Sequence, residues 1–350
     1  MKPIRVVVLD DSAICRQRLR EILEAEGDIE VVAEAENGDR ILEIVRATKP
    51  HLLLVDLQMP GTGGHQTIEL VMANQPLPIL VVTALPEGVR RAAVFESVRR
   101  GALHLAEKPM AGDRALEMRL RAMVRELRNV FVVRHVGGNL KKPPAVAPAP
   151  NQPSGQAPGT LAVGIAASAG GPLAVASVLA DLPRDFPAAI AIVQHLPTGF
   201  AQAFVEFLQS RVAFPIRLVS NRLLIEPGTI YVAPDDRHLV AADRHFAPSN
   251  DPPVGGHRPA ADMLLSSLAD ALGTRAAGVV MSGIGKDGTS GLRALRARGA
   301  LTLVQDEGSS AVYGMPRAAL ESEAALLALD PPGIARALRD WASTHGSRKK

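Results

Sequence analysis

The chain alternates short apolar runs with longer amphipathic segments, and this alternation constrains its fold more than any other feature. In the N-terminal part the apolar runs, which predict strands, cover residues 4–9, 29–33, 52–55, 79–82 and 103–105. Helical spacing covers residues 16–25, 40–47, 66–74, 90–100 and 114–128. Such repeats predict an α/β fold in which helices wrap a five-stranded parallel sheet, with a ligand crevice at the carboxyl ends of the strands.

A segment rich in proline and alanine interrupts this alternation. Residues 129–159 carry no hydrophobic period and contain Pro143, Pro144, Pro148, Pro150, Pro153 and Pro158. Such a composition is typical of an extended, semi-rigid linker. We therefore expect a first domain at residues 1–128, a linker at 129–159 and a second domain at 160–346.

Composition excludes several classes of protein. No apolar run approaches the roughly 20 residues that span a bilayer, so we expect no membrane insertion. A net charge of +3 and an aromatic content of 3% offer neither a basic patch nor a stacking platform, so we expect no nucleic-acid partner. Cys15 is the single cysteine of the chain. A disulfide framework is thus excluded, and we expect a cytoplasmic location.

Polar residues follow the strands predicted for the first domain. Asp10 and Asp11 follow the first strand, Asp56 follows the third, Thr83 the fourth and Lys108 the fifth. Three carboxylates that converge in one crevice repel one another unless a hard cation joins them, which favours Mg²⁺ with oxygen ligands. The lysine and the threonine hydroxyl could hold phosphoryl oxygens. The alternative is that these residues only cap helices.

These residues, with Leu-Gln-Met-Pro-Gly after Asp56 and the Lys-Pro pair at 108 and 109, resemble the receiver domain of two-component response regulators, which has a flavodoxin-like fold. The resemblance implies that Asp56 accepts a phosphoryl group from a histidine kinase. It also implies that Asp11 and Asp56 bind Mg²⁺ with the help of Asp10, and that Thr83 and Lys108 respond to the phosphorylated state.

The first domain departs from the receiver pattern at two places. Leu105 stands where receivers usually have an aromatic switch residue, and Gly63-Gly64 stands where an aspartate-glycine pair is usual. Neither departure removes a carboxylate. We therefore expect the phosphorylation chemistry to survive both.

In the second domain, Ser168 follows the apolar run 161–167 and precedes Ala169, Gly170 and Gly171. This order predicts a strand that turns sharply into a helix and leaves the serine hydroxyl reachable. The amides after Ser168 would then lie near a helix N-terminus and could stabilise an oxyanion. The alternative is a serine that caps a helix after a core strand.

Two further polar residues follow predicted strands. His195 comes directly after the apolar run 188–194, and Asp287 lies in a glycine-rich turn between the run 276–281 and a helical segment at 290–298. Taken singly, His195 could be structural and Asp287 a helix cap. Together with Ser168 they supply a nucleophile, a base and an orienting carboxylate at strand ends of a mostly parallel, Rossmann-like sheet.

Motifs across residues 160–345 resemble the catalytic domain of the chemotaxis protein-glutamate methylesterases. They are Ala-Ser-Ala-Gly-Gly at 167–171, Gln-His-Leu-Pro-Thr-Gly-Phe at 194–200, Ala-Pro-Asp-Asp-Arg-His at 233–238, His-Arg-Pro-Ala-Ala-Asp at 257–262, Met-Ser-Gly-Ile-Gly-Lys-Asp-Gly at 281–288 and Tyr-Gly-Met-Pro at 313–316. The order of receiver, linker and this domain is also similar to that family.

This resemblance implies an enzyme that hydrolyses glutamate methyl esters on the cytoplasmic domain of methyl-accepting chemoreceptors and releases methanol. Ser168 would be the nucleophile, His195 the base and Asp287 its orienting group, with no cofactor in this site. Deamidation of receptor glutamines and phosphorylation by a CheA-type histidine kinase are further implications. The oxyanion and substrate region would comprise Ala169, Gly170, Ile284, His238, His257 and Arg258.

Two residues of that region depart from the family pattern. Ala169 replaces the usual threonine and Ile284 a common methionine. Their backbone amides can still serve an oxyanion hole, and we expect activity to survive. For His238, His257 and Arg258, ordinary loop polarity is the alternative interpretation. For the whole chain, the alternative to an enzyme is a phosphorylation-dependent binding module that has lost catalysis.

Overall fold

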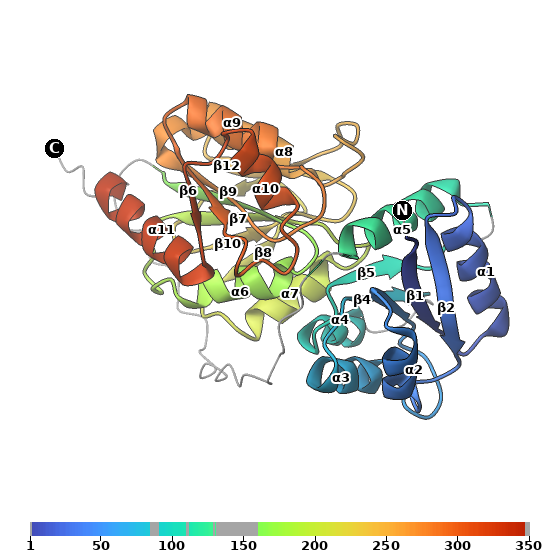
Figure 1. Cartoon of the computed structure of the whole chain (residues 1–350). Helices are drawn as coiled ribbons and strands as arrows, with labels where there is room; N and C mark the ends of the chain where they lie inside the picture. The colour runs from blue at the N-terminus through green and yellow to red at the C-terminus, as the bar shows by residue number, and fades with distance from the viewer. Residues whose placement is uncertain (1, 85–90, 110–111, 129, 131–159, 347–350) are drawn as a thin grey trace. The chain divides into compact units, whose positions relative to one another are not determined.

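A computed structural model describes residues 2–84, 91–109, 112–128, 130 and 160–346 (Figure 1). The chain divides into two compact units, Met1–Gly138 and Asn139–Lys350, and each is described by itself. All of the predicted linker 129–159 except Val130 lies outside the described residues. The predicted domain boundaries therefore stay predictions.

The first unit is a five-stranded parallel sheet with the order β2-β1-β3-β4-β5, as the alternating pattern predicts. The strands are β1 (Ile4–Leu9), β2 (Ile29–Ala35), β3 (Leu52–Val55), β4 (Ile79–Thr83) and β5 (His104–Glu107). The helices are α1 (Ala13–Glu24), α2 (Ile41–Thr48), α3 (Gly64–Asn74), α4 (Arg91–Arg99) and α5 (Arg114–Leu127). Strands such as β3 are buried along their whole length, because helices cover both faces of a parallel sheet.

Helix α1 begins at Ala13, three residues before the start at residue 16 that the sequence predicts. The cause is local. The side chain of Ser12 accepts a hydrogen bond from the backbone N–H of Cys15, at 3.4 Å, and so satisfies one of the free donors of the first turn.

The second unit contains a seven-stranded parallel sheet with the order β15-β14-β13-β6-β7-β10-β8. Its strands are β6 (Ala162–Ala167), β7 (Ala189–Gln194), β8 (Ile216–Leu218), β10 (Ile230–Val232), β13 (Ala276–Val280), β14 (Leu301–Gln305) and β15 (Leu327–Leu329). Its helices are α6 (Gly171–Ala180), α7 (Ala201–Gln209), α8 (Ala261–Leu272), α9 (Thr289–Ala297), α10 (Met315–Glu321) and α11 (Pro331–Gly346), with a 3₁₀ turn at Gly273–Arg275. The prediction of a mostly parallel second domain is confirmed.

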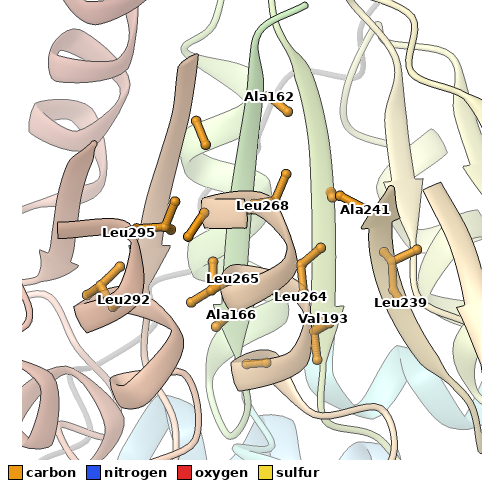
Figure 2. Packing of buried hydrophobic residues seen from close by; sticks show 14 of the residues in the cluster. Ala162, Ala166, Val193, Leu239, Ala241, Leu264, Leu265, Leu268, Leu292 and Leu295 are labelled. Atoms are coloured by element: carbon orange, nitrogen blue, oxygen red, sulfur yellow. The ribbon is translucent and has the colours of Figure 1, made fainter. Parts of the chain in front are cut away.

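A small antiparallel sheet, which the sequence pattern did not predict, accompanies the large one. It has the order β11-β12-β9 and consists of β9 (Leu223–Leu224), β11 (His238–Ala242) and β12 (His245–Ser249). Helix α8 packs between this sheet and the large one through Leu264, Leu265 and Leu268, as Figure 2 shows. Gly164 on β6 makes room for the helix, because a Cβ there would lie 2.6 Å from Leu265 Cδ2.

In each parallel sheet the strand order reverses beside the first strand. In the first unit β1 is followed by β2 on one side and β3 lies on its other side. In the second unit β6 is followed by β7 on one side, and β13 is followed by β14 on the other. Crossovers are right-handed, so helices on the two sides of such a point cover opposite faces and leave a crevice at the carboxyl ends of the strands. Among the described residues, no helix has both the length and the apolar character needed to cross a bilayer.

Candidate functional site

Ser168 lies at the end of β6, next to the point where the strand order reverses. Its backbone N–H donates to the carbonyl of Ser282, at 3.0 Å, which extends the ladder between β6 and β13 by one step. The chain then turns into α6 at Gly170, whose φ of 72° favours glycine. Ser168 is therefore fixed by the sheet rather than by a flexible loop, and the left-handed backbone conformation lies two residues after it.

Gly283 allows the two strand ends to approach each other. A Cβ at this position would lie 2.8 Å from Ser168 Cβ and 2.2 Å from Met315 Sδ. Because both neighbours are themselves packed, no larger residue can occupy position 283 without displacing the serine.

His195 and Asp287 form a buried pair. His195 follows β7, and its backbone N–H donates to the carbonyl of Ala167 at 2.9 Å. His195 therefore lies beside Ser168 at the carboxyl ends of the two strands. Its Nε2 lies 2.8 Å from Asp287 Oδ2. Its Nδ1 is buried and has no hydrogen-bond partner in the described part of the chain. An ionised Asp287 can only accept a hydrogen bond, so it favours the tautomer with the proton on Nε2. The lone pair then lies on Nδ1, which can accept a proton.

Asp287 accepts three backbone hydrogen bonds in addition to that from His195. The N–H of Ala261 donates to Oδ2 at 2.7 Å, and those of Asp262 and Gly288 donate to Oδ1, each at 2.9 Å. Burial acts to raise the pKa of Asp287, but the hydrogen bond and charge of His195 and the amides outweigh it, and the pKa lies below its usual value. Asp287 thus stays a carboxylate and also caps a helix, although the helix is α8 and not the one that follows it.

Two positioning residues were given no role from the sequence. Gln194 Nε2 donates to the carbonyls of Ser168, at 2.7 Å, and His195, at 3.2 Å, and so joins the two strand ends. Ser282 Oγ donates to the carbonyl of Ala169 at 2.7 Å and accepts from the N–H of Val312 at 2.9 Å. A polar residue at the last position of an apolar strand, directly before His195, was the available signal for Gln194.

The amides of Ala169, Gly170 and Ile284 donate to no acceptor within the described ranges of the chain. Ala169 and Gly170 follow Ser168 in the chain. Ile284 follows Gly283, which lies against Ser168. N–H groups beside a nucleophile can receive the negative charge of a tetrahedral intermediate. The arrangement fits the predicted oxyanion region, whose role stays a prediction.

His257 lies flat on His195, with ring centroids 4.1 Å apart and an angle of 4° between the planes. A tight turn places it there, because Gly255 and Gly256 have φ of 59° and 82° and Val254 pairs with His257 across them. Two successive positive φ angles are typical of a two-residue hairpin, in which glycine is favoured. His257 thus lies against the His195–Asp287 pair, and its place in the substrate region stays a prediction.

Arg258 and His238, also predicted for the substrate region, have different surroundings. Arg258 pairs with Asp236 through Nε, at 2.9 Å, and Nη2, at 2.8 Å, beside a partly open pocket that Gln194 also lines. His238 is fully buried. Its Nδ1 accepts from the N–H of Ala260 at 3.1 Å and its Nε2 contacts the carbonyl of Pro252 at 3.1 Å. The prediction that His238 lines the substrate region is therefore wrong: both ring nitrogens hold backbone at the start of α8.

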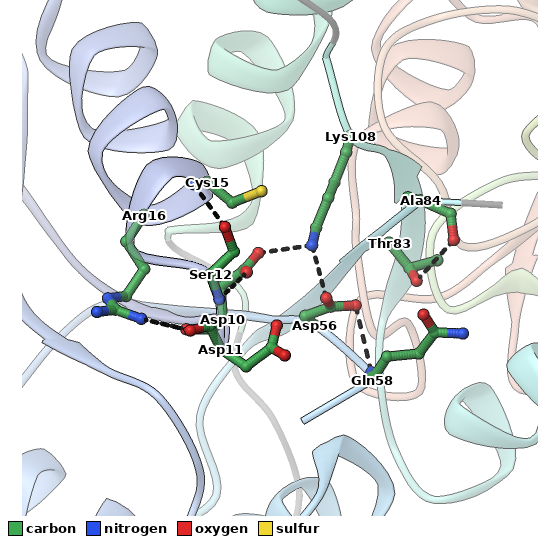
Figure 3. A network of polar contacts seen from close by, with 10 residues as sticks. All are labelled: Asp10, Asp11, Ser12, Cys15, Arg16, Asp56, Gln58, Thr83, Ala84 and Lys108. Carbon is green, nitrogen blue, oxygen red and sulfur yellow. Dashed lines mark hydrogen bonds and ion pairs between the residues drawn. The ribbon is translucent and has the colours of Figure 1, made fainter. Parts of the chain in front are cut away.

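In the first unit, the predicted acidic residues come together at the crevice between β1 and β3 (Figure 3). Asp10, Asp11 and Asp56 each offer an oxygen, and these oxygens lie within 4.8 Å of one another. Lys108 Nζ lies 2.7 Å from Asp10 Oδ2 and 2.6 Å from Asp56 Oδ2. Hard carboxylate oxygens at this spacing fit Mg²⁺, which binds one or two carboxylates directly and keeps several waters, through which a third carboxylate can act.

The electrostatics of this cluster reflect its burial. Burial raises the pKa of Asp10, against the hydrogen bond and charge of Lys108. Burial acts to lower the pKa of Lys108, but its contacts with Asp10 and Asp56 outweigh burial, and that pKa lies above its usual value. Thr83 Oγ1 donates to the carbonyl of Ala84, at 3.2 Å, so in this structure its hydroxyl is not directed at Asp56.

Sequence comparisons match both units to known families. The response regulator receiver domain matches residues 6–120, and the CheB methylesterase matches residues 163–338. A protein-glutamate methylesterase/protein-glutamine glutaminase of Anaeromyxobacter dehalogenans is 40% identical over 341 residues and is covered to 97%, as is this chain. The chain belongs to the CheB methylesterase family.

Other members of the CheB family agree with this assignment. A relative with the same description from Myxococcus xanthus is 38% identical over 323 residues, which are 92% of this chain and 89% of that protein. The crystal structure of the Thermotoga maritima CheB methylesterase catalytic domain is 30% identical, with a TM-score of 0.50, and covers 52% of this chain and 98% of its own. The resemblances stated from the sequence motifs, to a receiver followed by a CheB catalytic domain, are confirmed.

Proposed function

We propose that the chain is a phosphorylation-regulated protein-glutamate methylesterase of chemotaxis-type two-component signalling. Its substrate is the cytoplasmic domain of a methyl-accepting chemoreceptor, and it also deamidates receptor glutamines. Its phosphodonor is a CheA-type histidine kinase, and it acts in the cytoplasm. The observation that carries this proposal is the buried His195–Asp287 pair, 2.8 Å apart, with an unpartnered Nδ1 beside Ser168 at the end of the adjacent strand.

The geometry supports an acyl-enzyme mechanism. Ser168 Oγ attacks the γ-carbonyl of the methylated glutamate while its proton passes to His195 Nδ1. Asp287 holds the imidazolium through Nε2. The amides of Ala169 and Ile284 receive the oxyanion. Collapse of the intermediate breaks the ester C–O bond, and methanol leaves with the proton from His195. Water, deprotonated by His195, then hydrolyses the acyl-enzyme and restores the serine. With glutamine the leaving group is ammonia.

Regulation would begin at Asp56. Its carboxylate oxygen attacks the phosphorus of the phosphohistidine on the kinase, the P–N bond breaks and the kinase histidine leaves. Lys108, 2.6 Å from Asp56, neutralises part of the charge on the phosphoryl oxygens. Asp10, Asp11 and Asp56 would hold Mg²⁺, whose chemistry when bound is to neutralise the phosphoryl oxygens. Reorientation of the Thr83 hydroxyl from Ala84 toward the phosphoryl group would report the modification.

A binding module that has lost catalysis is the second candidate, and the site does not favour it. All three catalytic groups are present, and the contact of Nε2 with the Asp287 carboxylate favours the tautomer that a base requires. Ala169 contributes a backbone amide whatever its side chain. An acylating probe separates the two functions, because an adduct on Ser168 is expected only from an active site.

The test is release of methanol from methylated receptors of the same cell by the full chain, with and without a small phosphodonor and Mg²⁺. We expect release by the wild type and faster release after phosphorylation. Ser168→Ala should lower the rate by at least about 10³-fold, whereas Ser210→Ala, at an exposed serine after α7, should not change it. Asp56→Asn should abolish only the stimulation. Wild-type release by Ser168→Ala would refute the assigned nucleophile.

A further inference from the structure

Helices α8 and α9 exchange capping residues at their N-termini. The N-cap positions of the two helices, Ala260 and Gly288, supply no capping side chain. Asp287, which precedes α9, accepts from the N–H groups of Ala261 and Asp262 at the start of α8. Asp262, in the first turn of α8, accepts through Oδ1 from the N–H of Gly291 in α9, at 2.8 Å. Each aspartate therefore belongs to one helix start and satisfies donors of the other.

The two helix starts are also in close contact. A Cβ at Gly291 would lie 2.6 Å from Leu265 Cβ and 2.9 Å from the carbonyl oxygen of Asp262. A Cβ at Gly288 would lie 3.4 Å from Ala261 Cβ. Such spacing couples the position of α9 to that of α8, because neither backbone can move without meeting the other.

We propose that Asp262 is a positioning residue of the methylesterase triad: by capping α9 it fixes the turn before that helix, and through this turn it holds the Asp287 carboxylate against His195. This inference rests on the proposed function of the triad. Asp287 lies two residues before the first residue of α9, and Gly288 between them has a φ of 90°. A turn of this kind depends on its anchors on both sides, and Asp262 supplies the anchor on the helical side.

Accepting hydrogen bonds, rather than carrying charge, is the property of Asp262 that the arrangement uses. Burial raises the pKa of Asp262, the charge of Asp287 adds to this effect, and only backbone N–H groups of the start of α9 oppose it. A second negative charge beside Asp287 is thus a cost, while the carboxylate oxygen satisfies a donor at the start of α9. A neutral acceptor of the same shape should therefore replace Asp262.

The experiment compares three variants of the full chain: Asp262→Ala, Asp262→Asn and Asp270→Ala. Asp270 is the matched control, because it joins the same two helices at their other ends through Arg298, at 2.8 Å, with its side chain 75% exposed. The readouts are kcat and KM for methanol release, the NMR resonance of the His195 Nε2 proton, and the thermal midpoint.

We expect Asp262→Ala to lower kcat by about 10- to 100-fold, since a misplacement of about 1 Å at a catalytic group can cost that much. KM should change little, because the proposed role of Asp262 is exerted through Asp287 and not through contact with the substrate. The His195 proton resonance should shift as its bond to Asp287 loosens. Asp262→Asn should restore most of kcat and the resonance, and Asp270→Ala should leave both at the wild-type value.

Three outcomes would overturn the proposal. One is an Asp262→Ala protein with a lower thermal midpoint but wild-type kcat and resonance, since capping would then be structural only. Another is equal loss in the Ala and Asn variants. The third is the same loss in Asp270→Ala. If Asp262→Ala does not fold, Asp262→Ser, which keeps a shorter acceptor, takes its place. Absence of methanol release by the wild type would refute the proposed function, whereas the resonance still tests the role of Asp262.

Discussion

His195 presents Nε2, and not Nδ1, to the carboxylate of Asp287, at 2.8 Å. In the chymotrypsin triad the aspartate binds Nδ1 and the serine contacts Nε2. Here Nδ1 is the nitrogen without a partner in the described residues, so proton transfer from Ser168 would use the opposite side of the ring. The roles of a triad depend on which nitrogen holds the lone pair, and the Asp287 carboxylate sets this by accepting a hydrogen bond from the Nε2–H group.

Asp287→Asn should therefore impair catalysis more than folding. The asparagine amide can donate to Nε2, which would move the proton to Nδ1 and remove the acceptor for Ser168. We expect kcat to fall by about 10³- to 10⁴-fold, by analogy with the same change in a serine protease. Methanol release measures the effect, with Asp270→Asn on the exposed end of α8 as the control. A loss of less than about tenfold would contradict this tautomer argument.

The flat contact between His257 and His195, with centroids 4.1 Å apart, should hold the plane of the catalytic ring. Aromatic pairs contribute about 0.5–1.5 kcal/mol beyond burial, and each 1.36 kcal/mol corresponds to about tenfold in rate. His257→Ala should thus lower kcat by about 2- to 13-fold. His257→Phe keeps a ring in the stack and should retain most activity. If Phe and Ala lose activity equally, the imidazole of His257 acts through its nitrogens and not through stacking.

Acid should destabilise the second unit through Asp287. Because the pKa of this carboxyl in the folded state lies below its ordinary value, its contribution to stability is present above the unfolded pKa and is lost as the pH falls through the folded one. The slope of the unfolding free energy from this group approaches at most about 1.4 kcal/mol per pH unit. Chemical denaturation of the full chain at several acidic pH values should give a flatter dependence for Asp287→Asn. If the pH dependence of the unfolding free energy is the same in Asp287→Asn and in the wild type, Asp287 does not contribute to acid destabilisation.

Asp10→Asn should stabilise the first unit when Mg²⁺ is absent. Burial raises the pKa of Asp10, so its ionised form is unfavourable at neutral pH, and a neutral residue of the same shape removes that cost. We expect about 1 kcal/mol, or a rise of a few degrees in the thermal midpoint with a chelator present. The midpoint of the wild type should rise with added Mg²⁺, and that of the variant should rise less. Equal responses would show that Asp10 does not help to bind the ion.

The local sequence was sufficient to predict where the residues at the strand ends lie. It was insufficient to predict which residues hold them in position. Asp56, Ser168 and His195 each follow an apolar run, and parallel strands end at one edge, so their placement follows from the pattern alone. His238 also lies at a strand start in a polar segment, yet it is buried against the start of α8, which no local pattern reveals. The role of Asp262 depends on α9, whose Gly291 lies 29 residues further along the chain. Such contacts arise from helix packing, and so need the folded structure.

The reversal of strand order in both sheets has a consequence for change over evolutionary time and in the laboratory. The strands that lead to the reacting groups, β3, β6 and β7, are buried along their whole length, whereas the reacting groups stand just beyond the strand ends. The scaffold and the chemistry can therefore vary separately. We expect substitutions beyond the strand ends to change the site while the framework beneath keeps its sequence. Transfer of the 283–288 turn into another protein would, by contrast, also require the 257–262 segment. Hydrogen bonds join the starts of α8 and α9, so the two segments depend on each other.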